Sequence, residues 1–344
     1  MKQVIITVDT EGHDGIDPVK RLIWGITADN KECGINHIMD ISDRFSARVL
    51  FFVDIAEAWD YGRDRIADVI RHIRNRGHDV GVHIHPDHIA DKDRFFLWEY
   101  TKEEQYEIIK KCTDLYVEIT GEQPLAFRAG KYGANQDTLN ILDDLGYKYD
   151  FSQFFGQKWC GIKPPVAITL PQKIKGLIEI PVIVFRSFKL GKIIRYDKLD
   201  AQIDSSEYKH IMQTICSDKR NIIVSLFFHS FSMLDWRKDP DQPVLIPNEE
   251  KKFIKALEYI HKSEGFEFIS LDDLTNIFYI DDYTFQKESI NDILSTKGFI
   301  KSLWYTLKRI YSIRAYNRKA QWIIYGGLIF LILIVIVGLL YWIM

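Results

Sequence analysis

The chain alternates short runs of β-branched and aromatic residues with longer stretches whose apolar positions recur at helical spacing. The short runs predict strands over 4–9, 47–54, 79–85, 125–130, 178–184, 222–229 and 266–271. The longer stretches predict helices over 35–45, 63–77, 101–121, 135–146 and 248–265. We expect Gly77, Gly146 and Gly265 to end three of these helices. About seven alternating units predict an α/β fold with a parallel sheet closed, or nearly closed, into a barrel.

Polar residues gather where the predicted strands end. Asp9 and Glu11 follow the first strand, and a histidine-rich stretch follows the third. Arg128 and His229 end the fourth and sixth strands. In a parallel barrel these ends meet at one rim, where active sites lie. The pattern therefore predicts one catalytic site built from all of these segments.

The stretch "GHDVGVHIHPDH" (77–88) places His83, His85 and His88 within six positions. Residues i and i+2 of a strand face the same side, so His83 can pair with His85, and Asp9 with Glu11. A carboxylate with two imidazoles is a common three-ligand set for a catalytic metal. We expect Glu11 and His83 to be ligands and favour His85 as the third, with His88 as its competitor, since a turn after Pro86 could return it to the metal. Zn²⁺ is the expected ion.

Three further residues complete the predicted chemistry. Asp9 can act as the general base toward a water molecule that the metal activates. Arg128, in "FRAGKYG", can hold that carboxylate by paired hydrogen bonds. His229 ends a very apolar strand and is suited to protonate a leaving amine.

Charge and cysteine content narrow the function classes. The formal net charge is -3 and no long basic run occurs in the first 280 residues, which argues against a nucleic-acid partner. The four cysteines form no CxxC pair, which argues against a cysteine zinc site and a disulfide framework and fits a reducing compartment. A strand pattern begins at the first residues, so we expect no cleaved signal peptide.

The C-terminal region has a different composition. Residues 322–343 carry no charge and are long enough to cross a membrane as one helix. Aromatic residues lie near both ends of this segment, and basic residues precede it: Trp322, Tyr325, Tyr341 and Trp342; Lys308, Arg309, Arg314, Arg318 and Lys319. The basic flank predicts a single-pass C-terminal anchor with the catalytic domain in the cytoplasm. We therefore expect a catalytic barrel over 1–280, a juxtamembrane connector over 281–320 that lies along the membrane surface, and a transmembrane anchor over 321–344.

Five segments, in order, resemble the motifs of the polysaccharide deacetylase (NodB-homology, carbohydrate esterase family 4) superfamily across residues 1 to 280. They are "ITVDTEG", "GHDVGVHIHPDH", "FRAGKYGAN", "LGYKYDFS" and "VSLFFHS". The resemblance implies a distorted (β/α)7-type barrel that uses a divalent metal, usually zinc, to remove an acyl group from a sugar. It also implies that Asp9 is the base, His83 a metal ligand, Arg128 the residue that orients the base, and His229 the acid. Tyr132 matches a backbone N–H donor to the oxyanion, and Asp150 matches the residue that supports the acid.

The chain departs from the family pattern at three points. Its first motif has Asp9-Thr10-Glu11 where the family has adjacent aspartates, so Glu11 takes the ligand role. Residue 87 is aspartate where the family has its second ligand histidine, and the usual proline of the arginine motif is replaced at Ala129 or Gly130. These changes affect the expected metal geometry more than the reaction type.

The predicted anchor narrows the expected substrate to a sugar at the membrane. We expect N-deacetylation of a lipid-linked amino sugar at the cytoplasmic face during assembly of a surface glycan. A deformylase or another amidohydrolase acting on a lipid-linked sugar is one alternative. A metal-free, membrane-tethered sugar-binding protein is the other.

Overall fold

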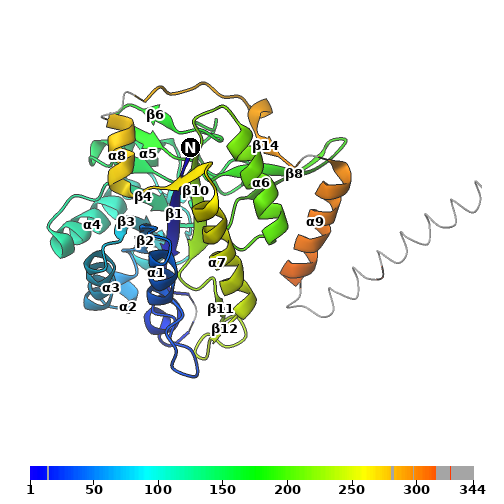
Figure 1. Cartoon of the computed structure of the whole chain (residues 1–344). Coiled ribbons are helices and arrows are strands. Elements are labelled where there is room, and N and C mark those ends of the chain that lie inside the picture. The colour runs from blue at the N-terminus through cyan, green and yellow to red at the C-terminus, as the bar shows by residue number, and fades with distance from the viewer. Residues whose placement is uncertain (14, 280–282, 297, 315–325, 327–344) are drawn as a thin grey trace, which may run out of the picture. The chain divides into compact units, whose positions relative to one another are not determined.

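The computed structural model describes residues 1–13, 15–279, 283–296, 298–314 and 326 (Figure 1). Two compact units are present. The larger comprises Met1–Arg186 and Tyr196–Ser295, and the smaller contains Ser187–Arg195 and the chain from Thr296 onward. All of the predicted site residues belong to the larger unit.

A nine-stranded, mostly parallel sheet forms the centre of the larger unit (Figure 1). Its strand order is β10-β1-β2-β3-β4-β5-β7-β6, and β13 pairs with the start of β1 beside β2. The strand bounds are β1 Lys2–Thr10, β2 Val49–Asp54, β3 Asp79–Ile84, β4 Ala126–Ala129, β5 Tyr149–Asp150, β6 Gln172–Ile174, β7 Leu177–Glu179, β10 Ile223–His229 and β13 Phe266–Phe268. The predicted α/β fold is therefore present, but this sheet is an open half-barrel.

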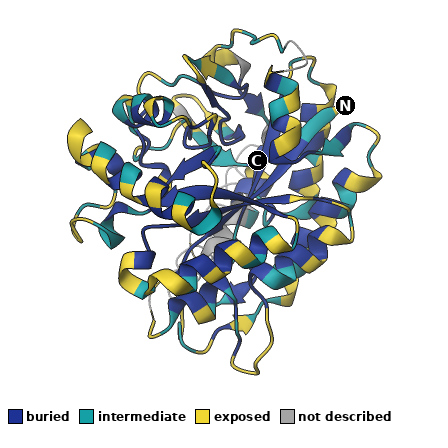
Figure 2. Ribbon diagram, turned by 90° about the vertical axis from the view of Figure 1, so that its left-hand side faces the viewer, coloured by how far each residue is buried: buried dark blue, intermediate teal, exposed yellow. Residues whose placement is uncertain are grey.

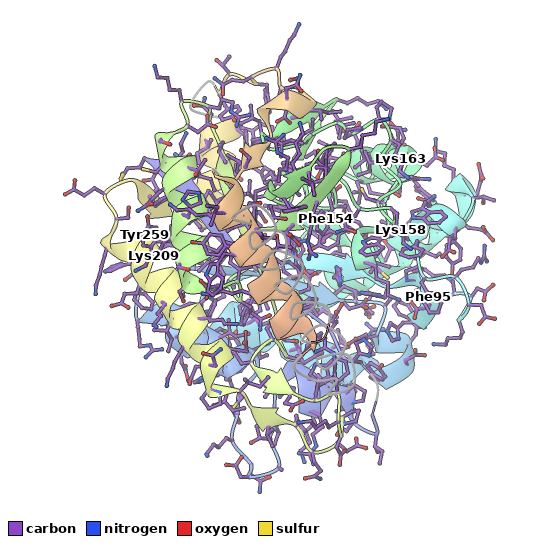
Figure 3. The ribbon with its side chains drawn as sticks, turned by 90° about the vertical axis from the view of Figure 1, so that its right-hand side faces the viewer. Phe95, Phe154, Lys158, Lys163, Lys209 and Tyr259 are labelled. Carbon is purple, nitrogen blue, oxygen red and sulfur yellow. The ribbon has the colours of Figure 1, made fainter. Side chains whose placement is uncertain are left out.

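Amphipathic helices cover the sheet. They are α1 Ile35–Asp43, α2 Ala58–Tyr61, α3 Arg63–Asn75, α4 Lys102–Thr120, α5 Gln136–Asp144, α6 Ser205–Ser217, α7 Pro247–Lys262 and α8 Leu271–Tyr279. Figure 2 shows their exposed outer faces and the buried strands between them. Strand β1 is buried from Val4 to Thr10 because it has parallel neighbours on both edges and helices over the sheet. Helices α6 and α7 lie together, with the Lys209 ammonium 6.0 Å from the centre of the Tyr259 ring (Figure 3).

The predicted strand over 178–184 is wrong as a single element. Strand β7 ends at Glu179, and β8 begins only at Val184. Pro181 lies between them, and proline cannot donate a backbone hydrogen bond to a neighbouring strand. Strand β8 (Val184–Leu190) instead joins β9 (Ile193–Lys198) and β14 (Leu294–Ser295) in a separate three-stranded sheet, so the main sheet does not continue into a closed barrel.

The predicted helix ends are correct at two of three glycines. Gly77 and Gly146 follow α3 and α5 with φ of +81° and +85°, the left-handed conformation that glycine adopts without strain. Helix α7 ends earlier than predicted, at Lys262, and Ser263 occupies its C-cap instead of Gly265.

The smaller unit contains α9 (Phe299–Arg314), where the Ser302 hydroxyl donates a hydrogen bond to the Ser187 carbonyl. The predicted membrane span over 322–343 lies outside the described residues, apart from Gly326. Within the described part of the chain, no helix combines the length and apolar character needed to cross a membrane.

Candidate active site

Strand register places the polar strand ends in one row across the half-barrel. Asp9 of β1 lies beside His229 of β10, and His83 of β3 lies between Asp54 of β2 and Arg128 of β4. Neighbouring residues in register point to the same side of a sheet. The row therefore brings five chemically active side chains from five strands to one rim.

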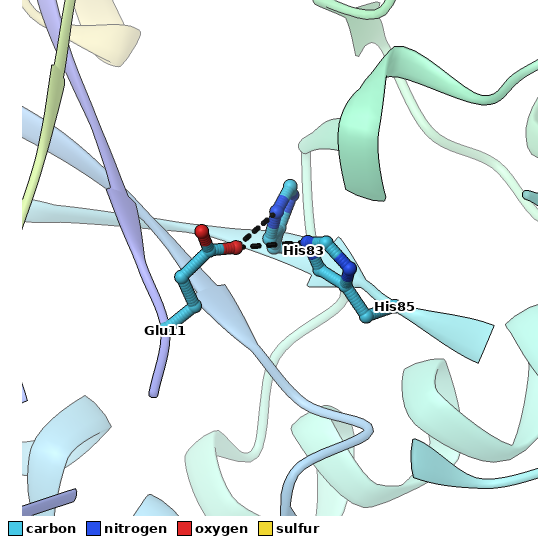
Figure 4. Close-up of side chains that lie close together, drawn as sticks. All are labelled: Glu11, His83 and His85. Atoms are coloured by element: carbon cyan, nitrogen blue, oxygen red, sulfur yellow. Dashed lines mark hydrogen bonds and ion pairs between the residues drawn. The ribbon is translucent and has the colours of Figure 1, made fainter. Parts of the chain in front are cut away.

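Glu11, His83 and His85 converge at this rim (Figure 4). One oxygen of Glu11, Oε2, lies 3.1 Å from His83 Nε2 and 2.8 Å from His85 Nε2. The His83 side chain is fully buried, and those of Glu11 and His85 are 11% and 13% exposed. This is the ligand set favoured from the sequence, with His85 rather than His88 beside His83.

The two imidazoles are held for metal binding in different ways. His83 Nδ1 lies 2.8 Å from the Arg128 carbonyl oxygen, to which it donates, so Nε2 is the ring nitrogen that faces Glu11. Burial by itself would lower the pKa of His85, but the facing Glu11 carboxylate raises that pKa to about 9. Burial would likewise raise the pKa of Glu11, yet the histidines hold it well below its usual range. One carboxylate and two imidazoles in this arrangement suit a divalent ion such as Zn²⁺, whose binding would displace the imidazole proton.

Gly130 leaves the space that the His85 ring occupies. A Cβ atom at residue 130 would lie 2.6 Å from the Ile84 carbonyl oxygen and 2.7 Å from carbon atoms of the His85 ring. Any larger residue would therefore displace the imidazole or the strand end. The small residue at position 130 and the placement of the His85 ring therefore depend on each other.

Arg128 fixes Asp9 in the manner expected of an orienting residue. Its guanidinium is fully buried and donates to Asp9 Oδ1 at 2.5 Å and to the Thr7 hydroxyl at 3.0 Å. It also donates to the Phe151 carbonyl at 3.3 Å and lies over the Phe52 ring. These contacts keep Asp9 in one orientation with a positive charge beside it.

His229 and Tyr132 complete the rim. His229 Nε2 lies 3.7 Å from Glu11 Oε1, and the ring stacks on Phe231 with centroids 4.9 Å apart. Burial lowers the pKa of His229. Lys131 and Tyr132 both have positive φ, of 51° and 58°, an uncommon backbone conformation for non-glycine residues that is concentrated at functional sites.

Two predicted residues lie elsewhere. The His88 ring hydrogen-bonds through Nδ1 to Asp60 and belongs to a separate group with Asp54 and Glu57. Asp150 is fully buried, accepts a hydrogen bond from the Ser152 hydroxyl at 2.6 Å and pairs with Glu179 instead of contacting His229. Asp150 also does not line the cavity described next.

A cavity of about 940 Å³ opens over the rim and contains Asp9, Glu11, His83, His85 and His229. Sequence reasoning missed several of its residues, among them Asp54, Glu57 and Lys198. Asp54 carries the same signal as Asp9, a carboxylate at the end of an apolar strand. Lys198 gives no comparable signal, because its ammonium reaches the cavity from the separate sheet and lies 3.3 Å from the centre of the Phe227 ring.

The chain is similar to known proteins in sequence and in fold. The family model for polysaccharide deacetylase matches residues 17–149. The chain is 38% identical over 50 residues to the peptidoglycan deacetylase-like protein FGM2 of Gibberella zeae, an alignment that covers 14% of this chain and 15% of that relative.

Solved structures show the same fold at low sequence identity. A Mycobacterium smegmatis protein classed with the polysaccharide deacetylases is similar over 83% of this chain and 93% of its own, with a TM-score of 0.52 and 14% identity. A PuuE allantoinase is similar over 82% and 92%, with a TM-score of 0.50 and 13% identity. A Pseudomonas aeruginosa PAO1 protein classed with the polysaccharide deacetylases is similar over 80% and 89%, with a TM-score of 0.50 and 12% identity.

The half-barrel and the family match confirm the resemblance predicted from the motifs. Residues 17–149 match the polysaccharide deacetylase family, and the half-barrel has the same fold as solved structures classed with that family. The family implies a hydrolase that deacetylates carbohydrates.

Proposed function

We propose that this protein is a metal-dependent hydrolase that removes the N-acetyl group from a lipid-linked amino sugar at the cytoplasmic face of the membrane. The convergence of Glu11, His83 and His85 beside the Asp9–Arg128 pair carries the proposal. It supplies a ligand set and an oriented carboxylate within one cavity, which metal-assisted amide hydrolysis requires.

Each site residue has a defined task in this reaction. A divalent cation held by Glu11, His83 and His85 would polarise the acyl carbonyl and acidify a water molecule. Asp9, fixed by Arg128, takes the proton from the attacking water. The backbone N–H of Tyr132 stabilises the negative charge on the acyl oxygen. His229, across the rim, donates a proton to the departing sugar nitrogen.

The charge of the cavity supports an anionic substrate. Lys131, Lys198 and Arg237 line it together with the acidic residues. The Lys198 side chain is partly buried, and burial lowers its pKa although Asp200 lies 3.7 Å away. A sugar attached to a lipid through phosphate would offer these cations a compensating negative charge.

A second hollow gives room for the rest of such a substrate. It measures about 520 Å³ and shares Lys131, Tyr132 and Lys198 with the main cavity. Aromatic side chains surround it: Phe96, Phe154, Trp159 and Tyr196. Phe154, labelled in Figure 3, comes from the loop after β5. Aromatic walls of this kind suit sugar rings and isoprenoid chains alike. Together with the predicted membrane span, these walls favour a substrate drawn from the bilayer.

The first test is hydrolysis by the full-length, zinc-loaded protein in detergent. We expect release of acetate from an N-acetylated prenyl-phosphate sugar, and a loss of about 10²–10⁴-fold in kcat for Asp9→Asn, because the amide cannot accept the proton. Asp137→Asn, in the first turn of α5, is the matched control and should keep wild-type activity.

Three results would contradict parts of the proposal. Cleavage of a soluble N-acetylated sugar but not the lipid-linked one would refute the substrate. A mass change equal to loss of formyl would identify a deformylase. A third result would be that the protein takes up no zinc when zinc is supplied, and binds the sugar without hydrolysing it. That result would identify a sugar-binding protein.

A further inference from the structure

A second group of potential metal ligands lies beside the first. Asp54 is the last residue of β2, Glu57 precedes α2, and His88 ends the short helix after β3. One ligand atom from each residue lies within 4.8 Å of the other two. All three residues line the same cavity as Glu11 and His85.

Two buried oxygen atoms in this group accept no hydrogen bond within the part of the chain that the structure describes. Asp54 and Glu57 are both 0% exposed. Asp54 Oδ1 accepts hydrogen bonds from the backbone N–H groups of Ala56 and His85, and Glu57 Oε1 accepts one from the N–H of Gly12. Asp54 Oδ2 and Glu57 Oε2 accept no hydrogen bond from any described residue. Buried carboxylate oxygens without donors are costly, so this pair lacks a positive partner.

His88 is oriented as metal-binding histidines usually are. Its Nδ1 lies 2.7 Å from Asp60 Oδ2, and Asp60 is itself paired with Lys92 at 2.5 Å. A carboxylate on one ring nitrogen fixes the tautomer and leaves the other nitrogen, Nε2, able to bind a metal. Among the described residues, Nε2 of His88 has no hydrogen-bond partner. The ring is also packed edge-on against Tyr61.

We propose that Asp54, Glu57 and His88 form a second divalent-cation site, distinct from the Glu11–His83–His85 site. Two carboxylates and one imidazole suit a transition-series ion such as Zn²⁺ or Mn²⁺. The site also has a positioning role. Its carboxylates hold the N–H groups of Gly12 and His85, so a cation there fixes the backbone that carries two ligands of the first site.

Metal stoichiometry of the full-length protein tests the proposal. Protein stripped with a chelator is dialysed against Zn²⁺ or against Mn²⁺, and bound metal is measured by elemental analysis. We expect two equivalents in the wild type and one in Glu57→Gln, which preserves shape and removes the charge. His88→Gln changes a partly exposed ring and should likewise bind one equivalent of metal. This variant tests the proposal if Glu57→Gln does not fold. Asp60→Asn should keep the site but weaken its affinity about 10–100-fold.

Two controls separate this site from the first and from general damage. His83→Ala should also bind one equivalent, and combining it with His88→Gln should leave none. Glu179→Gln removes a carboxylate that is as buried as Glu57 but lies far from His88 in the sequence. This variant should still bind two equivalents of metal. Saturation of the wild type at one equivalent, or retention of two by both Glu57→Gln and His88→Gln, would overturn the proposal. Because the measurement does not use turnover, a protein that binds two cations without hydrolysing sugars would refute only the proposed function.

Discussion

The protein buries two pairs of carboxylates, and their surroundings differ. Asp54 and Glu57 lie on the cavity with His88 beside them. Asp150 and Glu179 lie in register on β5 and β7, fully buried, and line neither of the cavities described above. Among the described residues, each pair has two carboxylate oxygens with no ordinary hydrogen-bond donor. Each pair therefore needs either a shared proton or a cation.

The two pairs solve this problem in different ways. Burial, the charge of Asp150 and a hydrogen bond to Asp150 raise the pKa of Glu179 well above its ordinary value, so Glu179 keeps its proton and donates it to its neighbour. Burial and the charge of Asp54 likewise raise the pKa of Glu57 well above its ordinary value. The cavity pair differs in having an oriented imidazole within reach and access from solvent, which favours a cation over a shared proton. Carboxylate pairs alone therefore do not define a metal site; an oriented histidine and an open path distinguish one.

Removal of metal should give the largest difference in stability between variants of the two carboxylate pairs. Each occupied site stabilises the folded chain by about 4 kcal/mol when free metal exceeds its Kd a thousandfold. We expect a chelator to lower the melting temperature of the full-length wild type and of Glu179→Gln by the same amount. Glu57→Gln should show a smaller drop, because only the first site remains. Equal drops in all three proteins would show that the cavity pair binds no metal.

Substitution of Gly130 should weaken the first site without touching either carboxylate pair. The added methyl group of Gly130→Ala would press on the His85 ring. We expect zinc affinity at the Glu11–His83–His85 site to fall about 10–100-fold, as is usual when a ligand loses its orientation. Calorimetric titration of His88→Gln protein, which isolates this site, measures the change.

Gly77→Ala is the control for this prediction. Residue 77 has nothing within 4 Å of an added Cβ, but its φ of +81° makes alanine strained. This variant should lose about 1 kcal/mol of stability and keep its zinc affinity. An unchanged affinity in Gly130→Ala would show that His85 does not depend on the glycine.

The sequence predicted the parts of the site that depend on strand ends and failed where chain segments meet only in space. Period-two spacing predicted that Glu11, His83 and His85 come together. The structure brings these three side chains together, with Glu11 and His85 each one residue past the end of its strand. Asp150 was assigned to the acid from its position in a motif, yet its partner Glu179 comes from a strand whose continuation Pro181 interrupts. Lys198 could not be predicted, since β9 lies in a separate sheet and no local pattern indicates that its lysine reaches the cavity. The transmembrane segment remains a prediction.

The smallest expected effect is a change in how the stability of the protein depends on pH, and it comes from Glu179. The ordinary pKa of glutamate is about 4.3, and that of Glu179 is raised in the folded chain. Between these two values the folded state binds more protons than the unfolded state. Stability therefore falls as pH rises through this window, by at most about 1.4 kcal/mol per pH unit. Glu179→Gln cannot ionise, and its amide can donate to Asp150 permanently.

Chemical denaturation of Glu179→Gln and the wild type between acid and mildly alkaline pH tests this expectation. The two proteins should have similar stability at low pH, and the variant should become the more stable one as pH rises. Glu103→Gln, on the exposed first turn of α4, should follow the wild type. Parallel pH profiles for wild type and Glu179→Gln would mean that Glu179 is ionised in the folded chain. The closed pair would then need a cation as well, and the distinction between the two carboxylate pairs would be lost.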